Sequence, residues 1–290
     1  MQPTPPILFD RALLRKRRAR VAAHFSTHDF LLREMAERVA ESLSTMSYRF
    51  PTVVELGSHT GQLASLLAQR SGTTRYMQCD LSPAMLQQST GTRVAVDEEC
   101  LPFAENSVDA VVSIGTLHWV NDLPGTLAQI QRILKPDGLF MAILPGAESL
   151  HELRTVCAQT DAARSGGISP RVSPFIDIRD AGALLHRAGF ALPVVDTETL
   201  RVSYSDVFAV MRDLRCAAQQ NMLRQRLQHF TPRGWFMAMA ERYAQQFSDE
   251  ENRITASVEL ITMTAWKPSP NQQQPARRGS GTVSFLEGLG

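Results

Sequence analysis

Residues 53–61 carry the sequence Val53-Val54-Glu55-Leu56-Gly57-Ser58-His59-Thr60-Gly61. The β-branched pair at its start favours a strand, and three residues after it recur at helical spacing: Leu63, Leu66 and Leu67. Gly57 and Gly61 bracket a turn whose backbone a ligand can approach closely. Because a helix begins after this turn, free amide groups there would point at a bound anion. A tight strand–helix connection without a ligand has the same pattern, so the turn alone is a weak indication of a site.

Acidic residues at the strand ends strengthen this indication. Asp80 closes a predicted strand at 74–80 and lies 19 residues after Gly61. A nucleotide-binding fold places the acid that binds the ribose at a similar spacing, about 20 residues after the turn. Glu55 ends the first strand, and its carboxylate suits the amine of a ligand.

Strands and helices alternate up to residue 145, which predicts a parallel sheet covered by helices on both faces. Such sheets bind ligands at the carboxyl ends of their strands. Asp97 and Glu98 follow a short strand at 94–96, and His118 follows a strand at 108–114. The polar groups at four strand ends together predict a ligand site at one edge of the sheet.

Length and composition exclude several classes of protein. The 290 residues suit one large domain with an added lobe, and 43% hydrophobic residues suffice for a full core. A net charge of +1 gives no overall attraction to nucleic acid or to a membrane. The four cysteines show no paired spacing, which argues against a zinc site or a disulfide framework. No run of 18 apolar residues is present, so no transmembrane helix is predicted.

Residues 1–48 are predicted to form N-terminal helices. The basic stretch 11–20 is interpreted as a solvated helix face, with a patch for an acidic partner, a lipid headgroup or nucleic acid as the alternative. Asp29 is expected to cap the next helix, and Ser82 is expected to cap the helix that begins with Pro83.

The main domain is predicted to span residues 49–266, and 203–256 form a mostly helical lobe between its last two strands. The lobe is interpreted either as a lid or docking surface for a protein, or as a cap that only buries the sheet edge. We expect its arginines on the outer rim, with Tyr204, Phe208 and Met211 turned inward. Residues 267–290 are predicted to be a flexible tail.

The glycine turn and the acids at the strand ends resemble those of the class I S-adenosylmethionine-dependent methyltransferases. The resemblance implies a Rossmann-like sheet of seven strands with an antiparallel last strand at 257–266. It implies S-adenosylmethionine as the cofactor, with these contacts: Glu55, Gly57, Ser58, Gly61, Asp80, Leu81, Asp97, Glu98 and Ile114. The sequence departs from the family pattern at His59, where the family has glycine. We expect the turn to survive with His59 turned outward, or cofactor affinity to be low.

A closer resemblance covers nearly the whole chain. The segments 97–103, 117–124 and 133–138, the Ser-Pro loop at 169–175 and the segment 278–285 are similar to the arginine-hydroxylase family of mitochondrial complex I assembly factors. This resemblance implies hydroxylation of an arginine on a quinone-module subunit of respiratory complex I. It implies a bacterial member in the cytoplasm or peripherally at the inner face of the inner membrane, or the matrix side of a mitochondrion if the chain is eukaryotic.

Two rival functions remain open at this stage. The first is a true methyltransferase that acts on a carrier-bound acid, since methyl transfer requires mainly the positioning of the acceptor. The second is an assembly chaperone without catalytic activity, which would use the cofactor only as a structural ligand.

His118 and Trp119 are the candidate catalytic residues. They either contact the acceptor, or Trp119 anchors the following helix in the core while His118 is exposed. No metal site is predicted, because the spacing of the histidines does not give a two-histidine-one-carboxylate pattern.

Overall fold

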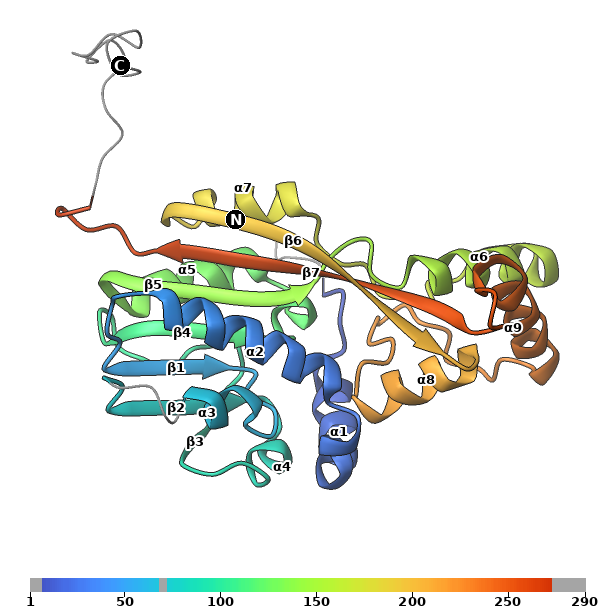
Figure 1. Cartoon of the computed structure of the whole chain (residues 1–290), viewed down its shortest axis with the longest axis horizontal. Helices are drawn as coiled ribbons and strands as arrows, with labels where there is room; N and C mark the ends of the chain where they lie inside the picture. Colours follow the sequence, from blue (N-terminus) through green and yellow to red (C-terminus); the bar gives the residue numbers. More distant parts are fainter. Residues whose placement is uncertain (1–6, 68–71, 273–290) are drawn as a thin grey trace, which may run out of the picture.

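The computed structural model describes residues 7–67 and 72–272. Its centre is a seven-stranded sheet with the spatial order β3, β2, β1, β4, β5, β7, β6 (Figure 1). The strands are β1 (Thr52–Leu56), β2 (Arg75–Asp80), β3 (Thr92–Ala95), β4 (Val108–Ile114), β5 (Leu134–Pro145), β6 (Ala191–Tyr204) and β7 (Ile254–Trp266). β7 runs antiparallel to both its neighbours, whereas the other pairs are parallel. The predicted fold, including its antiparallel last strand, is therefore confirmed.

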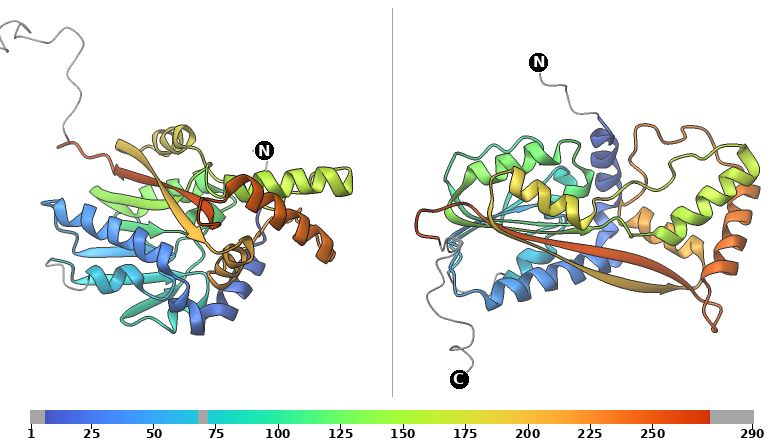
Figure 2. Two further views of the ribbon diagram at one scale, coloured as in Figure 1. Left: turned by 45° about the vertical axis from the view of Figure 1, so that its right-hand side comes forward. Right: turned by 90° about the horizontal axis from the view of Figure 1, so that it is seen from above.

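Helices cover both faces of the sheet (Figure 2). One face packs against α5 (Leu123–Ile133) and α7 (Ile178–Arg187), and the other against α2 (Phe30–Thr45) and α3 (Gln62–Leu67). Val54 belongs to the first core and its neighbour Val53 to the second, because successive strand residues point to opposite faces. Each fully buried aliphatic side chain of this kind contributes roughly 1.5–3 kcal/mol to folding. The central strands β1, β4 and β5 are mostly buried and apolar for this reason, whereas the edge strand β6 is largely exposed.

A third core forms a lobe beside the sheet. It holds α6 (His151–Ser165), α8 (Val207–Cys216) and α9 (Arg233–Phe247) around the buried side chains of Val156, Val210 and Tyr243. β6 and β7 extend past the other strands to reach α8 and α9 (Figure 1). The segment 203–256 thus contains two helices joined by the irregular residues 217–232.

The N-terminal helix α1 (Arg11–Val21) lies at the carboxyl ends of β1, β2 and β4 (Figure 1). Asp10 caps it, since its Oδ1 accepts a hydrogen bond from the amide of Leu13 at 2.9 Å. The amide of Asp10 donates to the carbonyl of Met222 at 2.8 Å, which ties the start of α1 to the loop after α8. A short 3₁₀ helix, η1 (Ala22–Thr27), then leads to α2.

Local expectations about helix starts were wrong at two points. Asp29 precedes α2 but makes no capping bond; its carboxylate instead contacts Gln62 at 2.8 Å and Arg33 at 2.8 Å. Ser82 precedes α4 (Pro83–Leu86) but does not cap it through its side chain.

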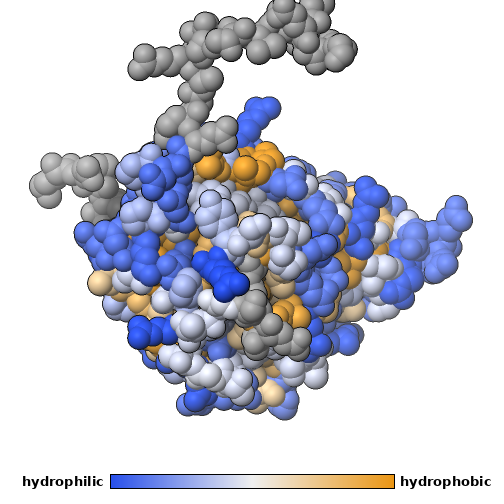
Figure 3. Space-filling model, turned by 60° about the vertical axis from the view of Figure 1, so that its left-hand side comes forward, coloured by the Kyte–Doolittle hydropathy of each residue, from blue (hydrophilic) through white to orange (hydrophobic). Residues whose placement is uncertain are grey.

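Hydrophilic and hydrophobic residues are interspersed on the face shown in Figure 3. Within the described residues, no helix is long and apolar enough to span a membrane. The predicted flexible tail falls mostly outside the described residues, which end at 272.

Candidate functional site

The glycine turn after β1 is packed against the rest of the protein. Gly57 and Gly61 have φ angles of 72° and 93°, values that favour glycine. The amides of Gly57 and Ser58 both donate to the carbonyl of Cys79, at 2.8 and 2.9 Å. A Cβ atom at Gly57 would lie 2.3 Å from Cγ2 of Thr116. The expected free amides of this turn are therefore used within the protein at Gly57 and Ser58.

His59 is turned inward, so the expectation of an outward side chain was wrong. Its side chain is buried and stacks on Phe25, with ring centroids 5.6 Å apart. Its φ angle is 47°, and its amide donates to Oδ2 of Asp80 at 3.2 Å. Burial, aided by the charge of Arg18, lowers the pKa of His59 to about 3, so the ring is neutral.

Asp80 is the centre of a buried ion pair with the N-terminal helix. Nη1 of Arg18 lies 3.2 and 3.1 Å from the two carboxylate oxygens, and each side chain is at most 1% exposed. Nη2 of Arg18 donates to Oγ1 of Thr116 at 2.8 Å. The amide of Ser82 donates to Oδ1 of Asp80 at 2.7 Å. Asp80 rather than the hydroxyl of Ser82 therefore holds the start of α4.

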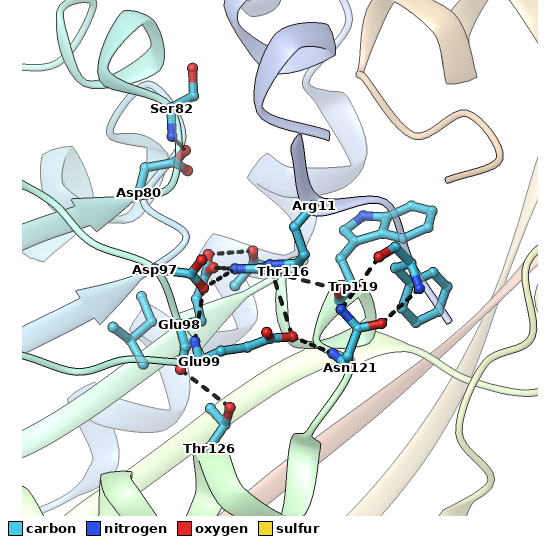
Figure 4. A network of polar contacts seen from close by, with 12 residues as sticks. Arg11, Asp80, Ser82, Asp97, Glu98, Glu99, Thr116, Trp119, Asn121 and Thr126 are labelled. Carbon is cyan, nitrogen blue, oxygen red and sulfur yellow. Dashed lines mark hydrogen bonds and ion pairs between the residues drawn. The ribbon is translucent and has the colours of Figure 1, made fainter. Parts of the chain in front are cut away.

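The acids that follow β3 bind a second arginine of α1 (Figure 4). Nη2 of Arg11 donates to Asp97 at 2.6 Å and also to Oε2 of Glu98. Thr116 donates to Oε1 of Glu98 at 3.0 Å, which joins this group to the Arg18 group. Opposite charges raise the pKa of Arg11 against the effect of its burial.

These contacts correct the interpretation of the basic stretch as a solvated face. Arg11 and Arg18 are seven residues apart and so lie on one side of α1, facing the acids. Sequence reasoning missed both arginines, and it missed Thr116. One feature of the sequence could have indicated them: several acids lie at the strand ends, and buried carboxylates need basic partners.

In chemical type, these residues suit S-adenosylmethionine, but the space beside them is filled by other side chains. Carboxylates at the ends of β2 and β3 are the groups that a ribose and an adenine require, and Oε1 of Glu55 and Oγ of Ser58 have no hydrogen-bond partner among the described residues. However, the side chain of Thr116 packs against Gly57 of the turn, and the guanidinium of Arg18 is paired with Asp80. In this conformation α1 occupies the space beside these acids.

Glu55 lies apart from this network. It is fully buried, and its Oε2 accepts a hydrogen bond from the hydroxyl of Tyr76 at 2.9 Å. Burial raises the pKa of Glu55 to about 8, so the carboxyl is largely protonated at neutral pH. Two further predicted contact residues are part of the packing: Ile114 is buried at the end of β4, and Leu81 packs with Leu14 of α1.

His118 and Trp119 lie in η2 (Leu117–Trp119), directly after β4. Both are buried, so the alternative with an exposed His118 was wrong. Oε1 of Gln219 accepts a hydrogen bond from Nε1 of Trp119 at 2.9 Å and lies 3.1 Å from Nε2 of His118. Burial lowers the pKa of His118 to about 3, which leaves a neutral ring. Gln219, from the loop after α8, was not predicted from the sequence.

Two cavities lie beside these residues. An inner cavity of about 90 Å³ is lined by His118, Gly115, Phe175 and other mostly apolar groups. An outer cavity of about 600 Å³ shares Trp119, Phe175 and Gln219 with it and opens between α8 and the Ser-Pro loop. Phe208, Met211 and several arginines line the outer cavity together. Phe208 is also 39% exposed, so the expectation that it turns inward, away from the arginines, was wrong for this residue.

No group of three or more metal-binding side chains occurs in the described part of the chain. The site is thus built from the ion-pair network of α1, the neutral His118–Trp119 pair and the two cavities.

Comparisons with known proteins identify the family and agree with the fold. Residues 54–142 match the model of a methyltransferase domain family. The chain is 38% identical to human "Arginine-hydroxylase NDUFAF5, mitochondrial", over 97% of this chain and 83% of that protein. It is 33% identical to "Malonyl-[acyl-carrier protein] O-methyltransferase" of Methylovorus sp. (strain MP688), over 92% of this chain and 93% of that protein. A solved methyltransferase structure from Bacillus halodurans has a TM-score of 0.56 at 15% identity, covering 80% of this chain and 98% of its own, and supports the fold.

Proposed function

Because the chain belongs to the class I S-adenosylmethionine-dependent methyltransferase family, in the group related to NDUFAF5, we propose that it binds S-adenosylmethionine and modifies an acceptor. The observation that carries this proposal is the convergence of Asp80, Asp97 and Glu98 beside the glycine turn. The cofactor binds where α1 lies in the present conformation. Binding therefore requires Arg11 and Arg18 to leave the acids.

The first candidate acceptor is an arginine of a protein, which is hydroxylated with one oxygen atom of dioxygen while a separate two-electron reductant reduces the other atom to water. It is supported by the similarity to the arginine hydroxylases, which extends over 97% of the chain and thus includes the lobe. The proposed partner is a quinone-module subunit of respiratory complex I. With this partner, the proposed location is the cytoplasm at the inner face of the membrane that holds the complex, or the matrix side of a mitochondrion if the chain is eukaryotic.

The second candidate is a carboxyl group on a carrier protein, which the enzyme methylates. The similarity to malonyl-carrier methyltransferases supports it, since it spans 92% of the chain. A specific observation also favours it: five arginines line the outer cavity, whose described lining includes no Asp or Glu. Such a wall attracts a carboxylate and repels a guanidinium.

Mass spectrometry of acceptors treated with the purified chain separates the two candidates. A protein arginine that gains the mass of one oxygen atom supports hydroxylation. A carboxyl that gains a labelled methyl group from S-adenosylmethionine supports methylation. If calorimetry detects no binding of S-adenosylmethionine to the intact chain, the shared premise of both candidates fails.

A further inference from the structure

The outer cavity is distinguished by its charge. Its lining includes five arginines, contributed by α1, the Ser-Pro loop, α8 and the loop that follows α8: Arg17, Arg171, Arg212, Arg215 and Arg226. Among the described lining residues there is no carboxylate. The net charge of the whole chain is only +1, so this concentration of positive charge is local.

Two of these arginines already have carboxylate partners outside the cavity lining. Arg171 binds both oxygens of the buried Asp161, with its Nε at 3.0 and 2.9 Å. Nη1 of Arg226 lies 3.7 Å from Asp10. Their positions are therefore fixed by the protein, and their positive charges are largely offset by these carboxylates.

The other three form no ion pair in the described part of the chain, although the charge of Asp10 acts on Arg17. Arg17 donates to the carbonyl of Asn221 at 2.9 Å, which is a neutral acceptor. Arg212 and Arg215 lie on the exposed side of α8 and have no ion-pair partner among the described residues. Burial and the charges of Arg226, Arg20 and Arg215 lower the pKa of Arg17, as expected for cations held close together.

The cavity leads toward the candidate catalytic residues. The outer and inner cavities share five lining residues: Trp119, Leu150, Phe175, Leu214 and Gln219. The inner cavity is mostly apolar and reaches His118 and Gly115, at the end of β4. A ligand with an anionic group and a slender arm fits this sequence of environments, because the anion meets the arginines while the arm enters the apolar part.

We propose that the arginine-lined outer cavity binds a phosphate or carboxylate group of the acceptor and directs an attached arm toward His118. This inference rests on the proposed function and names the chemistry of its acceptor. The shared chemistry is an anion that accepts bidentate hydrogen bonds from guanidinium groups. Its two possible sources are a phosphate on a carrier arm and a carboxylate other than the group that is modified.

Calorimetric titration of the full chain, without cofactor and at constant ionic strength, tests the proposal. The ligands are 4′-phosphopantetheine and pantetheine, which differ by the phosphate alone. We expect phosphopantetheine to bind at least roughly tenfold more tightly, because one charge-assisted contact contributes that much. Competition by inorganic phosphate or by malonate then identifies phosphate or carboxylate as the preferred source.

The double variant Arg212→Glu with Arg215→Glu should lose roughly a hundredfold or more in affinity for phosphopantetheine. Arg187→Glu on the distant helix α7 is a control exposed to solvent, and it should bind as the wild type does. Thermal unfolding of each variant shows whether it is folded.

Equal binding of the two pantetheine ligands, or unchanged binding by the folded double variant, would overturn the proposal. So would binding of a glutamate-rich peptide when neither small anion binds. The assay uses neither cofactor nor turnover. If the chain binds the anion but does not bind S-adenosylmethionine, the proposed function is refuted and the anion site is not.

Discussion

Arg18 satisfies Asp80 and Thr116 at once, and it does so with a guanidinium that is 1% exposed. A buried ion pair of this kind stabilises the fold mainly because the loss of either partner leaves an unpaired charge. Under the proposed function, the same pair competes with the cofactor's ribose for Asp80. Stability and cofactor affinity are therefore expected to change in opposite directions when Arg18 is altered.

Arg18→Met should lower the free energy of unfolding by roughly 3–5 kcal/mol, since Asp80 becomes an unpaired buried charge. It should also tighten S-adenosylmethionine binding by roughly tenfold to a hundredfold, because the closed state no longer competes. Urea unfolding and calorimetry measure the two effects. Arg15→Met on the exposed side of α1 serves as the control. A weaker affinity in Arg18→Met would instead make Arg18 part of the cofactor site.

Asp80→Ala should weaken S-adenosylmethionine binding, because the ribose loses a charge-assisted contact worth about 1.5–3 kcal/mol. This corresponds to a loss of roughly tenfold to a hundredfold in affinity. The opposite sign of the Arg18→Met effect distinguishes a cofactor contact from general loosening of the site. Unchanged affinity in a folded Asp80→Ala protein would remove Asp80 from the cofactor site.

Glu55 should make stability depend on pH. Its folded pKa of about 8 lies above the ordinary value of 4.5, so the folded state keeps a proton that the unfolded chain releases. This stability is fully present below pH 4.5 and is lost as the pH rises to about 8. Relative to Glu55→Gln, the wild type should lose about 1.4 kcal/mol per pH unit in this window. Parallel urea-stability curves for the two proteins would show that Glu55 is ionised in the fold.

At the scale of elements, the sequence predicts the strands better than it predicts what lies at their ends. The alternation of apolar strands and amphipathic helices predicts the sheet, because the spacing of apolar residues reflects which side of each element is buried. The position of α1 depends instead on ion pairs between residues 62 and 87 positions apart in the chain. A basic helix that binds buried acids has the same local pattern as a solvated basic helix. The contact between Gln219 and His118 likewise depends on how the loop after α8 packs against η2.

Gln219→Leu tests the link between the lobe and η2. It removes the acceptor of the Trp119 indole N–H and the partner of His118. An unsatisfied buried donor costs about 1–3 kcal/mol, so urea unfolding should show a loss of that size. Gln220→Leu, at the neighbouring position, should cost less, since Gln220 has no side-chain hydrogen bond in the described structure. Equal losses in the two variants would mean that the Gln219 contacts contribute little.

At the scale of the whole molecule, opposite charges are separated between two sides of η2. Four acids surround Arg11 and Arg18 on one side, at the carboxyl ends of β2 and β3. Five arginines surround the outer cavity on the other side. Arg17 on α1 lines that cavity, whereas Arg11 and Arg18 bind the acids. The helix α1 therefore contributes to both regions, and its displacement would change both.

Hydrogen exchange measured by mass spectrometry should report this displacement. On addition of S-adenosylmethionine, amides of residues 11–21 should exchange faster, because the cofactor displaces Arg11 and Arg18 from the acids. Amides of β1 and β4 should exchange more slowly, since a ligand that binds only the folded state stabilises the sheet. Asp80→Ala, in which cofactor binding is weakened, should show neither change at the same cofactor concentration. Slower exchange across residues 11–21 in the wild type would mean that α1 closes over the cofactor instead of yielding its place.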